Sequence, residues 1–196
     1  MSSIGKYINI KKKKETLKLI KNLKLLLRLD KKNIFNSLVN RAIQTLNNNG
    51  KIVFFGNGGS ASDAQHLATE LTVRYKKNRK ALAAISLVTD TSALTAIGND
   101  FTFEHIFSRQ IEAICSQDDL AIGITTSGNS KNILKAVKQC HKQTIPVFIF
   151  SGNNGGKVKL ITKNIIPFPK TSTSQVQVMQ IFFGQLFCEI LEEKLT

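Results

Sequence analysis

The feature that most constrains the fold is a series of short, continuously apolar runs that alternate with segments of helical pattern. The β-rich apolar runs occupy residues 51–55, 81–88, 119–124, 145–150 and 164–167. The helical pattern occupies residues 61–75, 91–97, 103–116, 131–142 and 174–194. Strands that lack polar alternation are buried on both faces, as in a parallel sheet covered by helices. We therefore expect an α/β fold with a doubly wound parallel sheet of about five strands.

The N-terminal part of the chain precedes the first strand and has a different pattern. Residues 16–48 are predicted to form one or two helices, with a break near Asp30 as one alternative. The run 47–50, three asparagines and a glycine, is a stop and turn signal. No linker, low-complexity tract or internal repeat marks a second domain. We expect residues 1–49 to be an N-terminal helical segment of a single domain and to pack subunits together.

The charge of the chain is concentrated at its start. Residues 1–32 contain eleven Lys or Arg and two acidic residues, which gives +9 of the total +15. Lysines 11–14 could meet nucleic acid or a membrane, but a solvated helix explains them as well, and we expect no nucleic-acid or membrane partner. The apolar positions of 17–27 are interrupted by lysines, unlike a signal peptide or a membrane span.

The three cysteines are odd in number and far apart in the sequence. They are Cys115, Cys140 and Cys188. Such cysteines fit reduced, packed thiols rather than a disulfide framework. We therefore expect a cytoplasmic protein.

A loop rich in hydroxyl side chains follows the third predicted strand. Residues 125–130 read Thr-Thr-Ser-Gly-Asn-Ser and precede a predicted helix. Backbone N–H groups at a helix N-terminus, together with hydroxyls, can bind a phosphate monoester without a lysine. The alternative is a capped helix start, since Ser, Thr and Asn are preferred caps. The loop is not a Walker A motif, because the Gly-Lys-[Ser/Thr] ending is absent.

A glycine-rich loop follows the first predicted strand. Residues 56–61 superficially resemble a dinucleotide fingerprint. Asp90, however, lies too far along the chain to be the acidic residue that usually follows such a fingerprint. Close approach of the backbone to a ligand is the better interpretation, with Asn57 and Ser60 as hydrogen-bonding side chains. His66 and Glu70 follow on one helix face. They can bind a metal together, act as an acid–base pair, or form only an exposed i,i+4 contact.

These motifs together resemble those of the phosphoheptose isomerases, a family with the SIS domain. Residues 56–61 and 63–66, with Glu70 and Arg74-Tyr75, resemble the first signature. The other signatures are matched, in the family's order, by residues 89–92, 97–100, 107–110 and 123–130. The resemblance runs from about Gly50 to the C-terminus. Residues 50–196 are therefore identified as a SIS domain.

The resemblance implies an activity and a set of site residues. The family converts sedoheptulose 7-phosphate into D-glycero-D-manno-heptose 7-phosphate through an enediol, toward bacterial lipopolysaccharide, and Glu70 would be the general base. The expected substrate-binding residues are Asn57, Gly58, Gly59, Ser60, Glu70, Asn99, Asp100, Thr125, Thr126, Ser127, Ser130 and Gln177. The resemblance also implies a homotetramer with one zinc per subunit. The zinc ligands would be His66, Glu70, Gln177 and Gln185.

The closing helix departs from the family at a catalytic position. Gln185 stands where the family has a histidine that serves as a second acid–base group or zinc ligand. A glutamine side chain cannot transfer a proton near pH 7 and is a poor zinc ligand beside an imidazole. Either Gln185 orients the substrate while another group or water moves the second proton, or the catalysis has been lost.

Two alternatives remain open from the sequence. One is a non-catalytic SIS-domain protein that binds the bacterial replication initiator, since relatives of that kind also lack the closing histidine. The other is an isomerase or a sensor for another sugar phosphate.

Overall fold

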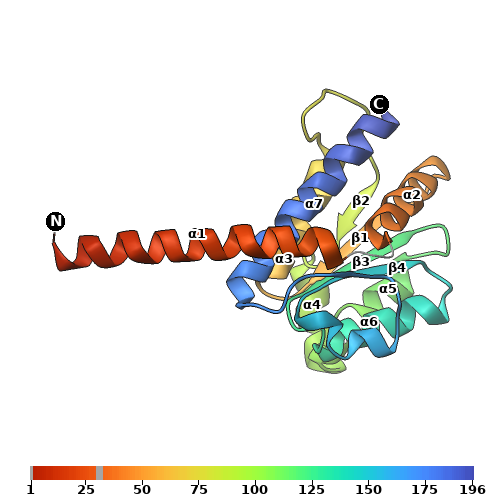
Figure 1. Ribbon diagram of the computed structural model, residues 1–196. Helices are drawn as coiled ribbons and strands as arrows, with labels where there is room; N and C mark the ends of the chain where they lie inside the picture. The colour runs from red at the N-terminus through yellow and green to blue at the C-terminus, as the bar shows by residue number, and fades with distance from the viewer. Residues whose placement is uncertain (1, 30–32) are drawn as a thin grey trace.

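The computed structural model describes residues 2–29 and 33–196 (Figure 1). The described elements are α1 (Ser3–Leu29), α2 (Ile34–Asn47), β1 (Ile52–Gly56), α3 (Gly59–Thr72), β2 (Ala84–Ser86), α4 (Thr91–Asp100), η1 (Phe103–His105), α5 (Ser108–Ile114), β3 (Leu120–Thr125), α6 (Lys131–Lys142), β4 (Val147–Ser151), η2 (Asn153–Gly155), η3 (Val158–Leu160), β5 (Ile165–Pro167) and α7 (Thr173–Leu195). The η elements are short 3₁₀ helices. Strands and helices alternate from β1 onward, as predicted.

All five strands are parallel and belong to one sheet, in the order β2-β1-β3-β4-β5. This confirms the predicted doubly wound α/β fold. The chain moves outward from β1 to β2 and then crosses back to β3 on the other side of β1. The strand order therefore reverses between β1 and β3, and ligands of such sheets bind in the crevice outside the carboxyl ends of those strands.

Alternate side chains of each strand enter two separate cores. Ile52 and Phe54 of β1 face a core completed by α2, α3 and α7. Val53 and Phe55 face the other core, completed by α5 and α6. Every residue of β1, β3 and β4 is buried. This two-sided burial is why the central strands read as uninterrupted apolar runs.

The N-terminal helices differ from each other in how they pack. α2 buries Leu38, Val39 and Ala42 against the sheet. α1 buries only Asn22 and Leu26 and extends away from the body (Figure 1). The predicted break near Asp30 lies outside the described residues. Within the part of the chain that is described, no helix combines the length and apolarity needed to cross a membrane.

Three local predictions were wrong. The second strand spans only Ala84–Ser86, because the preceding loop bonds to α3 instead, through Leu82 N–H and the Leu71 carbonyl at 3.0 Å. The segment 103–116 is not one helix, since η1 and α5 are separated by buried residues 106–107. Cys115 follows α5 in extended conformation rather than lying in a helix.

Candidate functional site

The loop after β1 is joined to the loop after β3 by a pair of asparagines. Asn57 Nδ2 donates to Asn132 Oδ1 at 2.9 Å, and Asn132 Nδ2 donates to Asn57 Oδ1 at 2.8 Å. Asn132 lies in the first turn of α6 and is buried. It was not among the predicted site residues, although it closely follows the hydroxyl-rich residues. The pair brings both predicted ligand-binding loops together at the switch point of the sheet.

The hydroxyl loop, residues 125–130, is held in shape by hydrogen bonds between its backbone N–H groups and its own hydroxyl side chains. Gly128 N–H donates to Thr125 Oγ1 at 3.1 Å, and Asn129 N–H donates to Ser127 Oγ at 3.1 Å. Gly128 has φ +66°, and a Cβ there would lie 2.4 Å from the carbonyl oxygen of Gly155. Thr125 is buried, so its hydroxyl supports the turn from below. The loop therefore needs glycine at 128 and holds a fixed shape.

The end of the hydroxyl loop leaves a side chain available to a ligand. Ser130 is the N-cap residue of α6, yet its side chain makes no capping hydrogen bond. Thr126, Ser127 and Ser130 are partly exposed, whereas Thr125 is not. The interpretation of this loop as only a capped helix start is therefore not supported. The positive end of the α6 dipole and three reachable hydroxyls suit an anion.

A buried glutamine holds the hydroxyl loop from beneath. Gln180 of α7 donates Nε2 to the carbonyls of Thr125 at 2.9 Å and Phe150 at 3.1 Å, and its side chain is buried. Gln180 was not among the predicted site residues. The sequence feature that could have pointed to it is a polar side chain in an otherwise apolar stretch of α7, three residues after Gln177.

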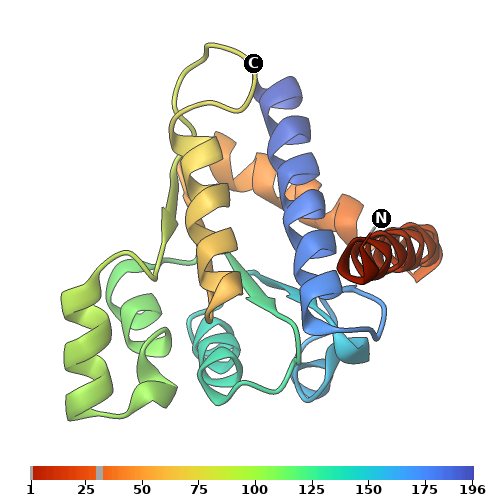
Figure 2. The ribbon, with the colours of Figure 1, turned by 90° about the vertical axis from the view of Figure 1, so that its left-hand side faces the viewer.

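The predicted catalytic residues lie on what we call the α3–α7 seam, where these two helices run side by side (Figure 2). His66 Nε2 lies 2.8 Å from Glu70 Oε1, and Gln185 Nε2 lies 3.5 Å from the same His66 nitrogen. At the other end of the seam, a Cβ on Gly59 would lie 2.1 Å from Gln177 Nε2. The structure thus places Gly59 beside Gln177 at one end of the seam. It places His66 beside Glu70 and Gln185 farther along the same seam.

A partly buried acid, Asp63, also lies on α3 between the two ends of the seam. Burial raises the pKa of Asp63 to about 6, although the nearby His66 opposes this shift. Its Oδ2 atom is buried and has no hydrogen-bond partner among the described residues. Ser60, predicted to bind substrate, is also buried, at 3% exposure.

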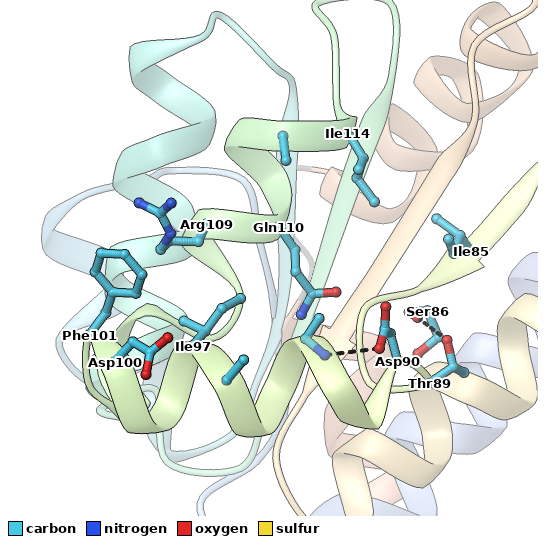
Figure 3. A pocket seen from close by; sticks show the side chains of 13 residues that line it. Ile85, Ser86, Thr89, Asp90, Ile97, Asp100, Phe101, Arg109, Gln110 and Ile114 are labelled. Atoms are coloured by element: carbon cyan, nitrogen blue, oxygen red, sulfur yellow. Dashed lines mark hydrogen bonds between the residues drawn. The ribbon is translucent and has the colours of Figure 1, made fainter.

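Asn99 and Asp100 lie apart from the other predicted site residues. They end α4, where Asn99 Nδ2 donates to Asp100 Oδ1 at 2.8 Å. Asp100 borders a pocket of about 540 Å³ between α4 and α5 (Figure 3). Its walls are mainly apolar, and no residue of the hydroxyl loop or the seam lines it. Within the described residues, no hydrogen bond joins either side chain to those two regions. We place the candidate site at the switch point, not in this pocket.

The residues expected to bind zinc offer one imidazole, one carboxylate and two amides. The only imidazole among them already contacts Glu70, and Gln185 presents an amide where zinc sites use nitrogen or thiolate ligands. Among the described residues, no three His, Cys, Asp or Glu side chains form a group able to hold a metal ion. Because neutral amides are weak zinc ligands, this set does not fit zinc.

Comparisons with known proteins agree with one another. A family model described as the SIS domain matches residues 20–152. A phosphoheptose isomerase of Aquifex aeolicus (strain VF5) is 50% identical over 148 residues, covering 76% of this chain and 78% of its own. One from Paramagnetospirillum magneticum (strain ATCC 700264 / AMB-1) is 49% identical over 158 residues, covering 81% and 82%. The solved phosphoheptose isomerase of Neisseria gonorrhoeae superposes with a TM-score of 0.87 at 34% identity, covering 95% of this chain and 99% of its own.

Proposed function

The chain belongs to the phosphoheptose isomerase family of SIS-domain proteins, and on that premise we propose that it isomerises sedoheptulose 7-phosphate to D-glycero-D-manno-heptose 7-phosphate. The observation that carries this proposal is the pairing of His66 and Glu70 on the helix that follows the glycine-rich loop. An acid–base pair close to an anion-binding loop is what an aldose–ketose isomerase needs.

The phosphate is proposed to bind at the hydroxyl loop. Thr126, Ser127 and Ser130 would donate hydroxyl hydrogen bonds, and the N-terminal N–H groups of α6 would add their dipole. Thr125 is proposed to act mainly through the shape of the loop, because its hydroxyl accepts from Gly128. Charge-assisted hydrogen bonds of this kind are the strong ones.

The sugar chain is proposed to extend from the phosphate toward the seam. Asn57 and the backbone of Gly58 and Gly59 would meet its hydroxyls, with Gln177 beside them. Ser60, Asn99 and Asp100 remain predicted substrate ligands. For Asn99 and Asp100, this prediction holds only if α4 of the same subunit, or a second subunit, completes the substrate-binding site.

Glu70 is proposed to move the carbon-bound proton. Its carboxylate removes a proton from C1 of the ketose, the C1–C2 bond gains double-bond character, and the electron pair of the C2 carbonyl becomes an enediolate oxygen. Glu70 then returns the proton to C2 while the carbonyl forms at C1. A positioned carboxylate with a proton-accepting oxygen beside an imidazole suits both half-reactions.

The hydroxyl proton must move from O1 to O2 during the same reaction. His66 is proposed to carry it, since an imidazole can both accept and donate a proton, whereas the Gln185 amide cannot transfer one. Gln185 then orients His66 or the substrate through its amide. No step is routed through zinc, because the ligand set does not fit that metal.

Assembly and cellular role follow the family as further proposals. A homotetramer is supported by α1, whose apolar side chains Ile4, Tyr7 and Ile10 are more than half exposed. Residues 1–49 are proposed as the packing segment and 50–196 as the SIS domain. The proposed place of the reaction is the cytoplasm, in making a heptose precursor of bacterial lipopolysaccharide.

The test is an assay of the purified, metal-stripped protein with sedoheptulose 7-phosphate, following the aldose product. Turnover without added metal is expected. No turnover, by folded protein that still binds the sugar phosphate, would refute the proposal and favour the non-catalytic, partner-binding alternative. A panel of other ketose phosphates in the same assay separates the proposed substrate from its relatives.

A further inference from the structure

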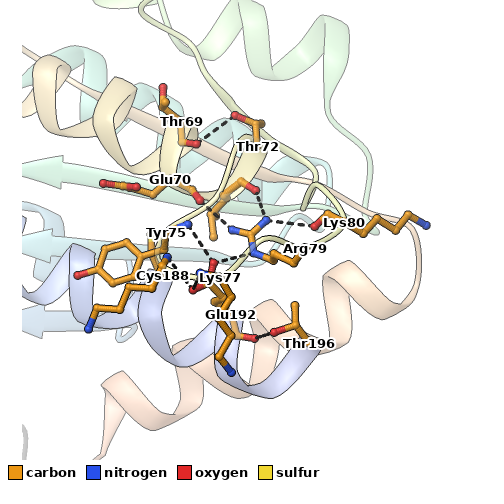
Figure 4. A network of polar contacts seen from close by, with 12 residues as sticks. Thr69, Glu70, Thr72, Tyr75, Lys77, Arg79, Lys80, Cys188, Glu192 and Thr196 are labelled. Carbon is orange, nitrogen blue, oxygen red and sulfur yellow. Dashed lines mark hydrogen bonds and ion pairs between the residues drawn. The ribbon is translucent and has the colours of Figure 1, made fainter.

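The proposed base lies at the end of α3, where a helix has carbonyl groups without helical partners. The side chain of Arg79 binds two of these carbonyls, those of Glu70 and Leu71 (Figure 4). Arg79 Nη2 donates to the carbonyl of Glu70 at 2.8 Å, and Nη1 donates to the carbonyls of Leu71 at 2.9 Å and Lys80 at 3.1 Å. A cation here also matches the negative end of the helix dipole. Arg79 therefore fixes the last turn of α3 through its backbone.

Arg79 is itself held by an acid on α7. Its Nε donates to Glu192 Oε1 at 3.0 Å, and both side chains are only 2% exposed. Glu192 also accepts the backbone N–H groups of Tyr75, Lys76 and Lys77, at 2.9, 2.8 and 2.9 Å. A buried ion pair is stable only when its remaining donors and acceptors are satisfied, and these bonds satisfy both partners.

The titration of Glu192 agrees with that geometry. Burial alone would raise the pKa of Glu192, but the three backbone donors and Arg79 outweigh it and lower the pKa to about 2. The carboxylate therefore stays ionised at every pH at which the isomerase would work.

Glu192 is also placed to set the position of α7 along the seam. It lies seven residues after Gln185, so both side chains project from the same side of α7. The ion pair thus joins the helix that carries Gln185 to the backbone of Glu70. His66 and Gln185, 3.5 Å apart, lie one turn back along α3 and two turns back along α7.

We propose that the buried Arg79–Glu192 pair is a positioning unit for Glu70, holding the last turn of α3 against α7 so that the carboxylate meets the sugar carbon. The inference rests on the proposed function, in which Glu70 is the base. Arg79 bonds to the carbonyl of Glu70 rather than to its carboxylate, so it acts through placement and not through proton transfer. Displacing a reacting group by about 1 Å can cost about 10²-fold in rate.

The experiment compares two variants with the wild-type protein in the sedoheptulose 7-phosphate assay. Arg79→Lys keeps a cation beside Glu192 but loses the fork of donors to the α3 carbonyls. The double variant Arg79→Met, Glu192→Gln removes both charges, and the carbonyl oxygen of the new amide can still accept some of the backbone N–H groups that the carboxylate accepted. The matched control is Glu189→Gln, which removes the exposed ion pair of Glu189 with Lys76 from the same helix and loop.

Both variants are expected to lower kcat by about 10- to 100-fold with KM close to wild type, because substrate binding does not use Arg79. Their thermal midpoints should fall because buried hydrogen bonds are lost, so kcat is measured well below each midpoint. The control should keep wild-type kcat. Folded variants with unchanged kcat, or a loss seen equally in KM, would overturn the inference and leave the proposed function intact. Absence of turnover in the wild type would overturn both.

Discussion

The hydroxyl loop and the α3–α7 seam form the two halves of the site and are built in different ways. The loop is six consecutive residues whose shape comes from hydrogen bonds between its own N–H groups and hydroxyl side chains, and from one glycine. The seam depends on side chains from two helices, with His66 and Gln185 separated by 119 residues in the sequence. Substitutions in the loop should therefore weaken binding, whereas substitutions on the seam should slow the chemical step.

The largest expected effect is on the seam. Glu70→Gln keeps the size of the side chain but removes the base, so kcat should fall by about 10²–10⁴-fold, the usual contribution of a general base. The dissociation constant for the sugar phosphate should change little, because the proposed phosphate site is the loop and not Glu70. Initial rates and titration calorimetry measure the two quantities separately. A fall in affinity as large as the fall in kcat would mean that Glu70 serves binding instead.

The opposite split is expected in the loop. Ser130→Ala removes a hydroxyl that the helix cap does not use, and loss of a hydrogen bond to a charged group costs about 1.5–3 kcal/mol. KM should therefore rise by about 10- to 100-fold while kcat stays near wild type. Steady-state kinetics test this, with Ser37→Ala, which changes an exposed serine of α2, as the matched control. A kcat effect without a KM effect would erase the contrast between loop and seam.

The same contrast explains what the sequence could predict. The loop and the strands were predictable because adjacent residues define them, as in the buried run 52–55 and the glycine at 128. Edge strand β2 was predicted too long, since Leu82 before it bonds to α3 and not to a strand. The Asn57–Asn132 pair, the anchor from Gln180 and the Arg79–Glu192 pair were missed, because each joins residues that meet only after folding.

The seam should also be convertible into a metal site. Gln185→His would place a second imidazole near His66, beside Glu70, and supply the nitrogen ligand that the wild-type set lacks. Zinc at a hundredfold excess over its dissociation constant should then raise the unfolding free energy by about 2.7 kcal/mol. Thermal unfolding with and without zinc measures this. Adding His66→Ala should abolish the gain. Equal stabilisation of the wild type by zinc would show that its own ligands suffice.

The smallest expected effect concerns Asp63 on α3. Because burial holds its pKa at about 6 in the folded protein, above the unfolded value, the native state alone retains a proton between about pH 4 and pH 6. The unfolding free energy should therefore fall as pH rises through that interval. Asp63→Asn should stabilise the protein at pH 7 by about 1–2 kcal/mol, after allowance for solvent screening, and leave it unchanged at pH 4. Urea unfolding of the wild type and the variant at both pH values measures this difference. Equal changes in unfolding free energy at pH 4 and pH 7 would contradict the raised pKa of Asp63.

The most direct measurement of the central claim is the exchange of the carbon-bound proton, independent of net turnover. The metal-stripped protein is incubated with sedoheptulose 7-phosphate in D₂O, and deuterium at C1 of the ketose and C2 of the aldose is followed by NMR. The account predicts that wild-type protein incorporates deuterium and that Glu70→Gln does so far more slowly. Exchange by Glu70→Gln at the wild-type rate would contradict the assignment of Glu70 as the base that forms the enediol.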